Sequence, residues 1–221
     1  MLSIALFDFS KICYKDLLPL LPENEQKRLT HGKSEAYRRA SGAGRALLFA
    51  LFRATMGKDA PTVFSTKLGA PYFETSRVRF SISHDDTVVA VALSPSGREV
   101  GVDVQGFHSI CRFDDEHLAA LRDRYRLLKR AGDCPEIRLW KAELREGRFT
   151  FMPMECSSIK SDFPSSFLAD FTFTEALLKA RGTGFSDVKK ASLYLKDYES
   201  GALCIKDTSC HLHVMSFCIK K

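Results

Sequence analysis

A carboxylate and an ammonium group stand four residues apart in the second half of the chain, at Glu175 and Lys179. In a helix this spacing brings both side chains onto one face. Helix formation does not require such a pair. A site for a metal-bound pyrophosphate does require it, because the metal and the phosphate oxygens must both be neutralised. The pair lies in the stretch from Phe171 to Phe185, which is therefore the first candidate for chemistry.

Two other stretches carry polar groups at strand-like spacing. Asp103 and Gln105 are two residues apart among valines, so a strand would place both on one face. We expect Asp103 to be buried, where a carboxylate must be met by a metal or a basic residue, and we favour the metal. The third stretch, Phe80–Asp85, contains Ser83 and His84.

In their order along the chain, these motifs resemble those of the Sfp-type 4'-phosphopantetheinyl transferase family. The family pattern is Gly-Lys-Pro, Ser-His, Gly-hydrophobic-Asp-hydrophobic-Glu, an aromatic residue before Lys-Glu-Ala-x-x-Lys, and Gly-x-Gly. The matching residues here are Gly69-Ala70-Pro71, Ser83-His84, Gly101 to Gln105, Phe171 to Lys179, and Gly182 with Gly184. The likeness extends upstream to Arg38-Arg39 and Gly44-Arg45, which are similar to the family's basic helix. Each motif alone is weak, so the resemblance rests on their order.

The resemblance implies an α+β fold of two pseudo-symmetric α/β subdomains with a coenzyme A cleft between them. It implies the transfer of 4'-phosphopantetheine from coenzyme A to a serine of an apo acyl or peptidyl carrier protein, with release of 3',5'-ADP. Mg²⁺ would be the cofactor, coenzyme A the substrate and the carrier protein the partner. Because two related halves already supply a cleft, we expect a monomer.

The same resemblance implies a role for each matching residue. Glu175 would take the proton of the carrier serine, and Lys179 would stabilise the phosphate in transfer. The implied metal ligands are Asp103, Gln105 and Glu175. The implied contacts to coenzyme A come from Arg45, Ser83, His84 and Lys179.

Three positions depart from the family pattern. Ala70 replaces a lysine that would contact the cofactor phosphate, Gln105 replaces an acidic residue, and Thr174 replaces the lysine before the glutamate. These departures leave open a second function, that of a non-catalytic relative that binds coenzyme A or a carrier protein.

The elements that position these motifs follow from hydrophobic periodicity. Alternation predicts a strand at 2–7, and an apolar stripe predicts a helix from about Ser34 to Met56 that Gly57 ends. Further strands are expected at 78–82, 87–93, 99–104, 191–195, 202–205 and 211–219. Further helices are expected at 114–131 and 174–181. A helix followed by strands in each half indicates subdomains at 1–99 and 100–221, with a partly irregular insertion at about 133–170.

Each candidate residue also has a structural reading. Thr172-x-x-Glu175 has the form of a capping box at a helix start. His84 could be an ordinary residue at a strand end, and Lys179 and Arg45 could be surface charges. With the resemblance taken into account, we favour the functional reading of all of them.

A rival set of candidate metal ligands consists of Cys204, Cys210, His211 and His213. Two histidines at strand spacing with two thiols nearby could bind zinc, but the spacing matches no standard zinc module, so we do not favour this site. Trp140-Lys-Ala-Glu143 superficially matches the family's last motif. It lacks the following alanine and the second lysine, so we reject it.

Composition is consistent with a soluble enzyme. The chain of 221 residues has a net charge of +6 and no apolar run near the ~20 residues that span a membrane. The seven cysteines are irregularly spaced, and no secretory leader is evident, so we expect reduced thiols in the cytoplasm. The positive charge suits a polyphosphate or an acidic carrier, and a nucleic-acid-binding module is the least favoured alternative.

Overall fold

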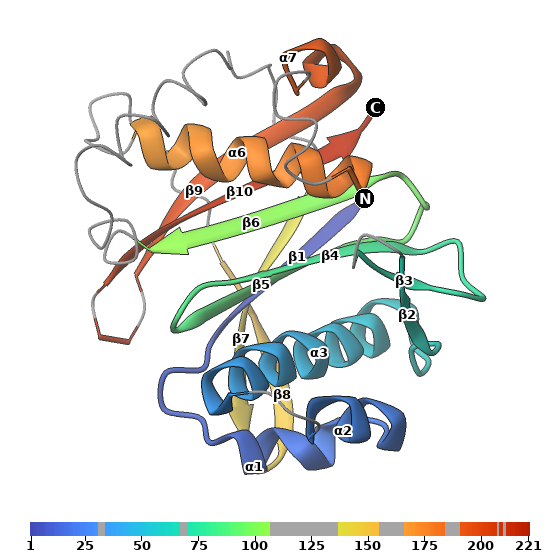
Figure 1. The fold of residues 1–221 in the computed structure, drawn as a ribbon, viewed down its shortest axis with the longest axis vertical. Helices are drawn as coiled ribbons and strands as arrows, with labels where there is room; N and C mark the ends of the chain where they lie inside the picture. The colour runs from blue at the N-terminus through green and yellow to red at the C-terminus, as the bar shows by residue number, and fades with distance from the viewer. Residues whose placement is uncertain are drawn as a thin grey trace.

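The computed structural model describes residues 1–30, 34–66, 70–106, 137–154, 166–183, 191–206, 208–209 and 211–221. Within these ranges the protein is an α+β structure built from a five-stranded sheet, a three-stranded sheet and a short hairpin (Figure 1). The predicted helix at 114–131 and the motif glycines Gly69 and Gly184 lie outside the described residues.

The larger sheet has the strand order β4-β5-β1-β7-β8. Its strands are β1 (Leu2–Asp8), β4 (Arg79–His84), β5 (Val88–Ser94), β7 (Ile137–Arg145) and β8 (Arg148–Pro153). The first strand, β1, pairs antiparallel with β5 on one side and parallel with β7 on the other. It is therefore an interior strand, which agrees with its nearly continuous apolar sequence.

The long helix α3 (Glu35–Met56) packs on one face of this sheet. Ser34 caps it by accepting a hydrogen bond from the Tyr37 amide, and Gly57 ends it in the left-handed conformation, as predicted. Beside α3 lie α1 (Tyr14–Leu17), η1 (Leu18–Leu20) and α2 (Glu23–Thr30). The hairpin of β2 (Val63–Ser65) and β3 (Pro71–Phe73) leads from α3 towards β4.

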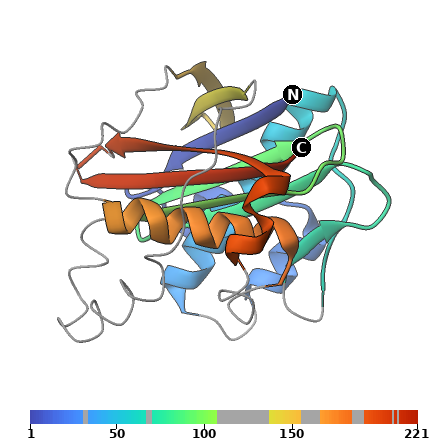
Figure 2. The ribbon, with the colours of Figure 1, turned by 90° about the horizontal axis from the view of Figure 1, so that it is seen from above.

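The smaller sheet has the order β6-β10-β9 and carries the second long helix. Its strands are β6 (Val100–Gly106), β9 (Tyr198–Lys206) and β10 (Leu212–Lys220). The helix α6 (Ser166–Arg181) lies along this sheet, as Figures 1 and 2 both show. The short α7 (Ala191–Tyr194) and η3 (Leu195–Asp197) precede β9.

The two sheets pack face to face through an apolar core. One side of that core comes from β1 and β5, including Leu2, Ile4 and Ala90, and the other from β6 and β10, including Val102 and Phe217. If the β2–β3 and β7–β8 hairpins and the short helices are left aside, the same element order occurs on both sides of the core, since β1-α3-β4-β5 and β6-α6-β9-β10 are each a strand, a long helix and two strands. In each set the second of the two final strands pairs antiparallel with both of the other strands.

One sequence-based expectation for the second half is wrong. Residues 191–195 form α7 and the start of η3, not a strand, because periodicity cannot assign a short apolar run. Within the predicted, partly irregular insertion at about 133–170, residues 137–153 form the regular β7–β8 hairpin of the larger sheet, and residues 133–136 and 155–165 lie outside the described residues. Pro153 suggested irregularity, but it ends β8 at the edge of the sheet, where a missing N–H costs little.

The second long helix is also longer than predicted, since α6 begins at Ser166 and not near Thr174. Among the described helices, none combines the length and apolar character that crossing a lipid bilayer requires.

Candidate functional site

Three of the predicted site residues meet in one hydrogen-bonded cluster. The Lys179 ammonium lies 2.6 Å from Asp103 Oδ1 and donates to Ser83 Oγ at 2.9 Å. The Ser83 hydroxyl in turn donates to the same Asp103 oxygen at 2.7 Å. Ser83 comes from β4, Asp103 from β6 and Lys179 from α6, so the cluster joins the two sheets and the helix. We call these three residues the Ser83–Asp103–Lys179 cluster.

Serine hydroxyls on β4 hold β6 in place beside the cluster. The backbone N–H of Val102 donates to Ser81 Oγ at 3.1 Å, and that of Val104 donates to Ser83 Oγ at 3.3 Å. Ser83 therefore uses its one O–H and accepts from two donors, which is the full capacity of a hydroxyl. A buried hydroxyl with this many partners has a fixed position, so the Ser83 hydroxyl holds the Asp103 and Lys179 side chains in a defined arrangement.

The helix α6 reaches Asp103 because it crosses β6 at a glycine. A Cβ at Gly101 would lie 1.8 Å from the carbonyl oxygen of Ala176 and 2.6 Å from the amide nitrogen of Ala180. Only a residue without a side chain allows this separation of helix and strand. The close approach places Lys179 over the strand that carries Asp103.

Glu175 lies one helical turn before Lys179 and is also buried. The capping-box reading of Thr172-x-x-Glu175 is wrong, because Thr172 lies within α6. Its hydroxyl donates to the Ala169 carbonyl oxygen and lies 2.7 Å from Ser216 Oγ on β10. Ser216 is the register partner of Asp103, so this face of α6 packs over the strand pair that carries the cluster.

Asp103 is paired with a basic residue in this structure. The Lys179 ammonium meets its carboxylate directly, while the predicted metal ligation by Asp103 stays a prediction. The Asp103 side chain is 8% exposed and that of Lys179 is 33% exposed, so the ion pair stands at the boundary between the core and solvent. An ammonium at such a boundary can exchange its partner for an anion that arrives from solution.

The donor set fits the predicted Mg²⁺, because carboxylates at Asp103 and Glu175 and an amide at Gln105 are the hard oxygen ligands that this ion takes. Among the described residues, no three His, Cys, Asp or Glu side chains stand together as metal ligands. The third proposed ligand, Gln105, is an amide.

Gln105 contacts a residue that sequence reasoning did not single out. Its Nε2 donates to Asp85 Oδ1 at 3.4 Å, and the N–H of Gly106 donates to Asp85 Oδ2 at 2.6 Å. Asp85 thus fixes the end of β6 to the end of β4. The available signal was its place directly after Ser83-His84, in the stretch that drew attention to those two residues.

The rival zinc set is only partly described. His213 is fully buried, with Nδ1 3.5 Å from Asp85 Oδ2 and Nε2 3.4 Å from Thr87 Oγ1. His211 is exposed, while Cys210 and the side chain of Cys204 lie outside the described residues. His213 therefore belongs to the contact between Asp85 and the β4–β5 turn.

Arg45 stands apart from the cluster. It is buried on α3, with Nε 3.7 Å from Glu25 Oε2, an oxygen that also accepts from Arg28. Burial lowers the pKa of Arg45, and the Glu25 carboxylate opposes this effect. The next residue towards the N-terminus, Gly44, packs on β4 and β5, which turns Arg45 away from the sheet and towards α2. The structure thus does not bring Arg45 to the other predicted site residues.

His84 ends β4 at the exposed edge of the site. Partial burial and the nearby Lys179 ammonium lower the pKa of His84, while Asp85, Asp103 and Asp86 act in the opposite direction. At neutral pH its imidazole is therefore uncharged and able both to donate and to accept a hydrogen bond.

The effect of Lys179 on His84 gives a test that needs no activity. Replacing Lys179 by methionine removes the neighbouring positive charge and leaves the three carboxylates, so the pKa of His84 should rise. The measurement is a pH titration of the histidine ring signals by NMR. Lys220→Met, which removes a lysine paired with Glu99, is the control and should leave His84 unchanged. An unchanged pKa in Lys179→Met would mean that the two side chains do not lie together.

The chain was compared with protein-family models and with curated proteins. Neither comparison found a match. Function is therefore inferred from the cluster, the fold and the motif resemblance.

Proposed function

We propose that this protein transfers 4'-phosphopantetheine from coenzyme A to a serine of an apo carrier protein, and that the Ser83–Asp103–Lys179 cluster with Glu175 forms its active site. The observation that carries the proposal is the convergence of three separate motifs in that cluster. Three motifs that lie far apart in sequence contribute to it: Ser-His, Gly-x-Asp and Glu-x-x-x-Lys. A lysine with only a surface role would not be expected to contact both Ser83 and Asp103.

The reaction sets what these residues must do. The carrier serine Oγ attacks the β-phosphorus of coenzyme A, a new P–O bond forms, and the bond to the leaving 3',5'-ADP breaks. The serine proton passes to a base, for which the buried Glu175 carboxylate is our candidate. Lys179 moves from Asp103 to a phosphate oxygen and stabilises the charge that develops there. A divalent cation held by Asp103, Glu175 and Gln105 would neutralise the pyrophosphate when bound.

The fold supports the proposal in a general way. The cluster lies where two sets of elements with the same topology meet, and the resemblance implies a cofactor cleft between two related halves. The pieces of the site come from both sets, since β4 belongs to the first and β6 and α6 to the second. The proposed subdomain boundary near residue 100 falls between β5 and β6.

The test is incubation with apo acyl carrier protein, coenzyme A and Mg²⁺. Intact-mass measurement should then find the carrier heavier by about 340 Da, the covalent addition of phosphopantetheine. Lys179→Met serves as the matched inactive protein. If the native protein leaves several different apo carriers at their original mass, the proposed activity is wrong.

A non-catalytic relative that binds coenzyme A is the second candidate. Two observations favour it. Ala70 stands where the family has a cofactor-binding lysine, and the Lys179 ammonium is paired with the Asp103 carboxylate. Calorimetric titration separates the two functions. A binding module should bind coenzyme A equally well with and without Mg²⁺ and modify no carrier, whereas the proposed enzyme should need the ion.

Gln105 gives a further prediction, because glutamate at this position would face Asp85. Gln105→Glu should lower the free energy of unfolding by about 1 kcal/mol at neutral pH, since two carboxylates would stand where an amide now donates. Urea unfolding at low and high salt measures the effect, which salt should weaken. Gln105→Met, which removes the amide without adding charge, is the control.

The same variant also tests the proposed metal ligand. If Gln105 contacts the cation during turnover, Gln105→Glu should lower the Mg²⁺ concentration needed for half-maximal transfer. Superimposable Mg²⁺ titrations of the two proteins would remove Gln105 from the set of ligands.

A further inference from the structure

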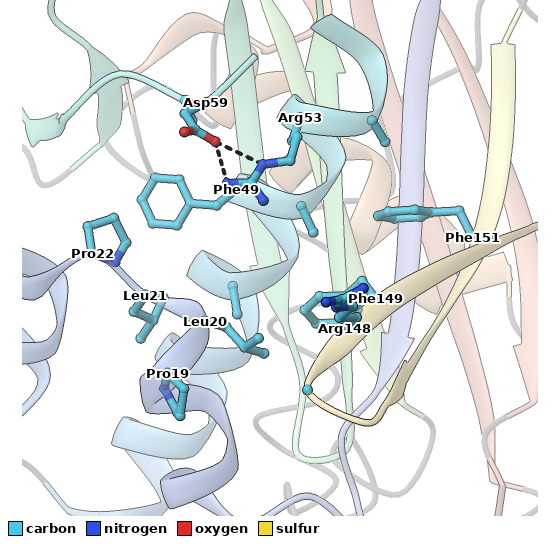
Figure 3. A pocket seen from close by; sticks show the side chains of 15 residues that line it. Pro19, Leu20, Leu21, Pro22, Phe49, Arg53, Asp59, Arg148, Phe149 and Phe151 are labelled. Atoms are coloured by element: carbon cyan, nitrogen blue, oxygen red, sulfur yellow. Dashed lines mark hydrogen bonds and ion pairs between the residues drawn. The ribbon is translucent and has the colours of Figure 1, made fainter. Parts of the chain in front are cut away.

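A cavity lies between the larger sheet and the helices that cover one of its faces. It has a volume of about 700 Å³ and opens between η1, α3 and the tip of the β7–β8 hairpin (Figure 3). None of its lining residues belongs to the candidate active site. In Figure 1, α3 lies on the opposite side of β4 and β5 from β6 and α6.

Large apolar side chains form the walls of this cavity. Leu20 comes from η1, Phe49 from α3, and Phe149 and Phe151 from β8. Phe149 is fixed by an edge-on contact with the buried Phe7, with ring centres 5.0 Å apart and an interplanar angle of 85°. The walls are therefore built on the core of the larger sheet, which makes the cavity largely pre-formed.

The charged groups at the rim leave one positive charge unbalanced. Arg53 donates from Nε to Asp59 at 2.8 Å, so these two residues neutralise each other. Arg148 is exposed and lines the cavity from the start of β8. No carboxylate in the described part of the chain pairs with it, whereas Arg145, directly opposite in the hairpin register, is paired with Glu143.

We propose that this cavity binds a small amphiphile with an apolar body and a single anionic group, such as a free carboxylate or sulfonate. The apolar body lies between Phe49 and Phe149, and the anion pairs with Arg148, which suits such a group because a guanidinium can donate two parallel hydrogen bonds. The volume falls in the range of pockets that enclose small organic ligands. The proposal concerns a site separate from the candidate active site and does not depend on the proposed transfer activity.

Anilinonaphthalene sulfonate is a suitable probe, because it has an aromatic body and one sulfonate and fluoresces when it enters an apolar site. Titration of the native protein should give saturable fluorescence. Arg148→Gln should weaken binding about tenfold through loss of a charge-assisted contact. Arg145→Gln, the same change in the paired arginine across the hairpin, is the matched control and should bind like the native protein.

Filling the cavity tests the location of the apolar body. Ala50→Phe places a ring into the space from α3 and should abolish saturable binding, with an unchanged circular dichroism spectrum and melting curve as the check on folding. If that variant does not fold, Ala54→Phe fills the same space from an exposed position one turn later. Decanoate should displace the probe from the native protein, and decanol should do so much less well.

Several results would overturn the proposal. Absence of saturable binding would show that the cavity holds no such ligand. An equal loss of probe affinity in Arg148→Gln and Arg145→Gln would mean that binding depends only on the net charge of the protein. Undiminished binding in the filled variants would place the probe elsewhere, and equal displacement by decanol and decanoate would remove the requirement for an anion.

Discussion

Replacing Asp103 by asparagine is expected to lower the rate of phosphopantetheine transfer by at least about 100-fold, the usual cost of losing one fixed electrostatic contact at a reacting centre. The change keeps the shape of the side chain and its hydrogen bond from Ser83, but removes the charge that holds Lys179 at 2.6 Å. It also removes a carboxylate from the proposed set of metal ligands. Single-turnover mass measurement on a carrier protein gives the rate.

Stability should change much less than activity in this variant. Lys179 keeps contact with solvent, so its ammonium can be hydrated when its partner becomes neutral. The free energy of unfolding should therefore fall by no more than about 1 kcal/mol. Asp59→Asn, at an exposed ion pair away from the cluster, is the matched control and should transfer at the native rate. Transfer by Asp103→Asn within about threefold of the native rate would exclude Asp103 from the chemistry.

Gly101→Ala should have the largest effect on stability, a loss of about 3 kcal/mol or more. The added Cβ would overlap the backbone of α6 at Ala176 and Ala180, and backbone atoms cannot rotate away as a side chain can. The helix would have to move off β6. Transfer should fail as well, because Lys179 would leave Asp103.

Gly42→Ala is the matched control for this prediction. Gly42 is also buried, but a Cβ there would meet Leu17 Cδ1 at 3.4 Å, which is ordinary contact. Because Gly42 lies within α3, alanine there should be neutral or stabilising by up to about 1 kcal/mol. Urea unfolding of both variants measures the contrast. Similar unfolding curves would show that α6 does not cross β6 as closely as the glycine contact requires.

Much of the first half was predictable because its signals are local. The ends of α3 are marked by Ser34 and Gly57, and alternating or continuous apolar runs mark β1, β4, β5 and β6. The convergence of Ser83, Asp103 and Lys179 could be expected from the motif resemblance, although not from their spacing. The partner of Asp103 could not be predicted. A buried carboxylate can be neutralised by a lysine or by a metal, and the sequence does not distinguish the two.

The unpredicted features depend on contacts between distant segments. The β7–β8 hairpin finds its place through parallel pairing with β1, more than 100 residues earlier, and no local pattern encodes that pairing. Arg45 was assigned to the cofactor because its motif matched. Its contact with Glu25 depends on the packing of α2 against α3, which periodicity does not reveal.

The strand order of the smaller sheet constrains how the chain folds. β10 lies between β6 and β9, so neither outer strand has a partner strand in this sheet until β10 is added. The apolar face of β1 and β5 that the sheet covers stays open until then. Folding should therefore be slow, with an interval in which the partly folded protein is prone to aggregate.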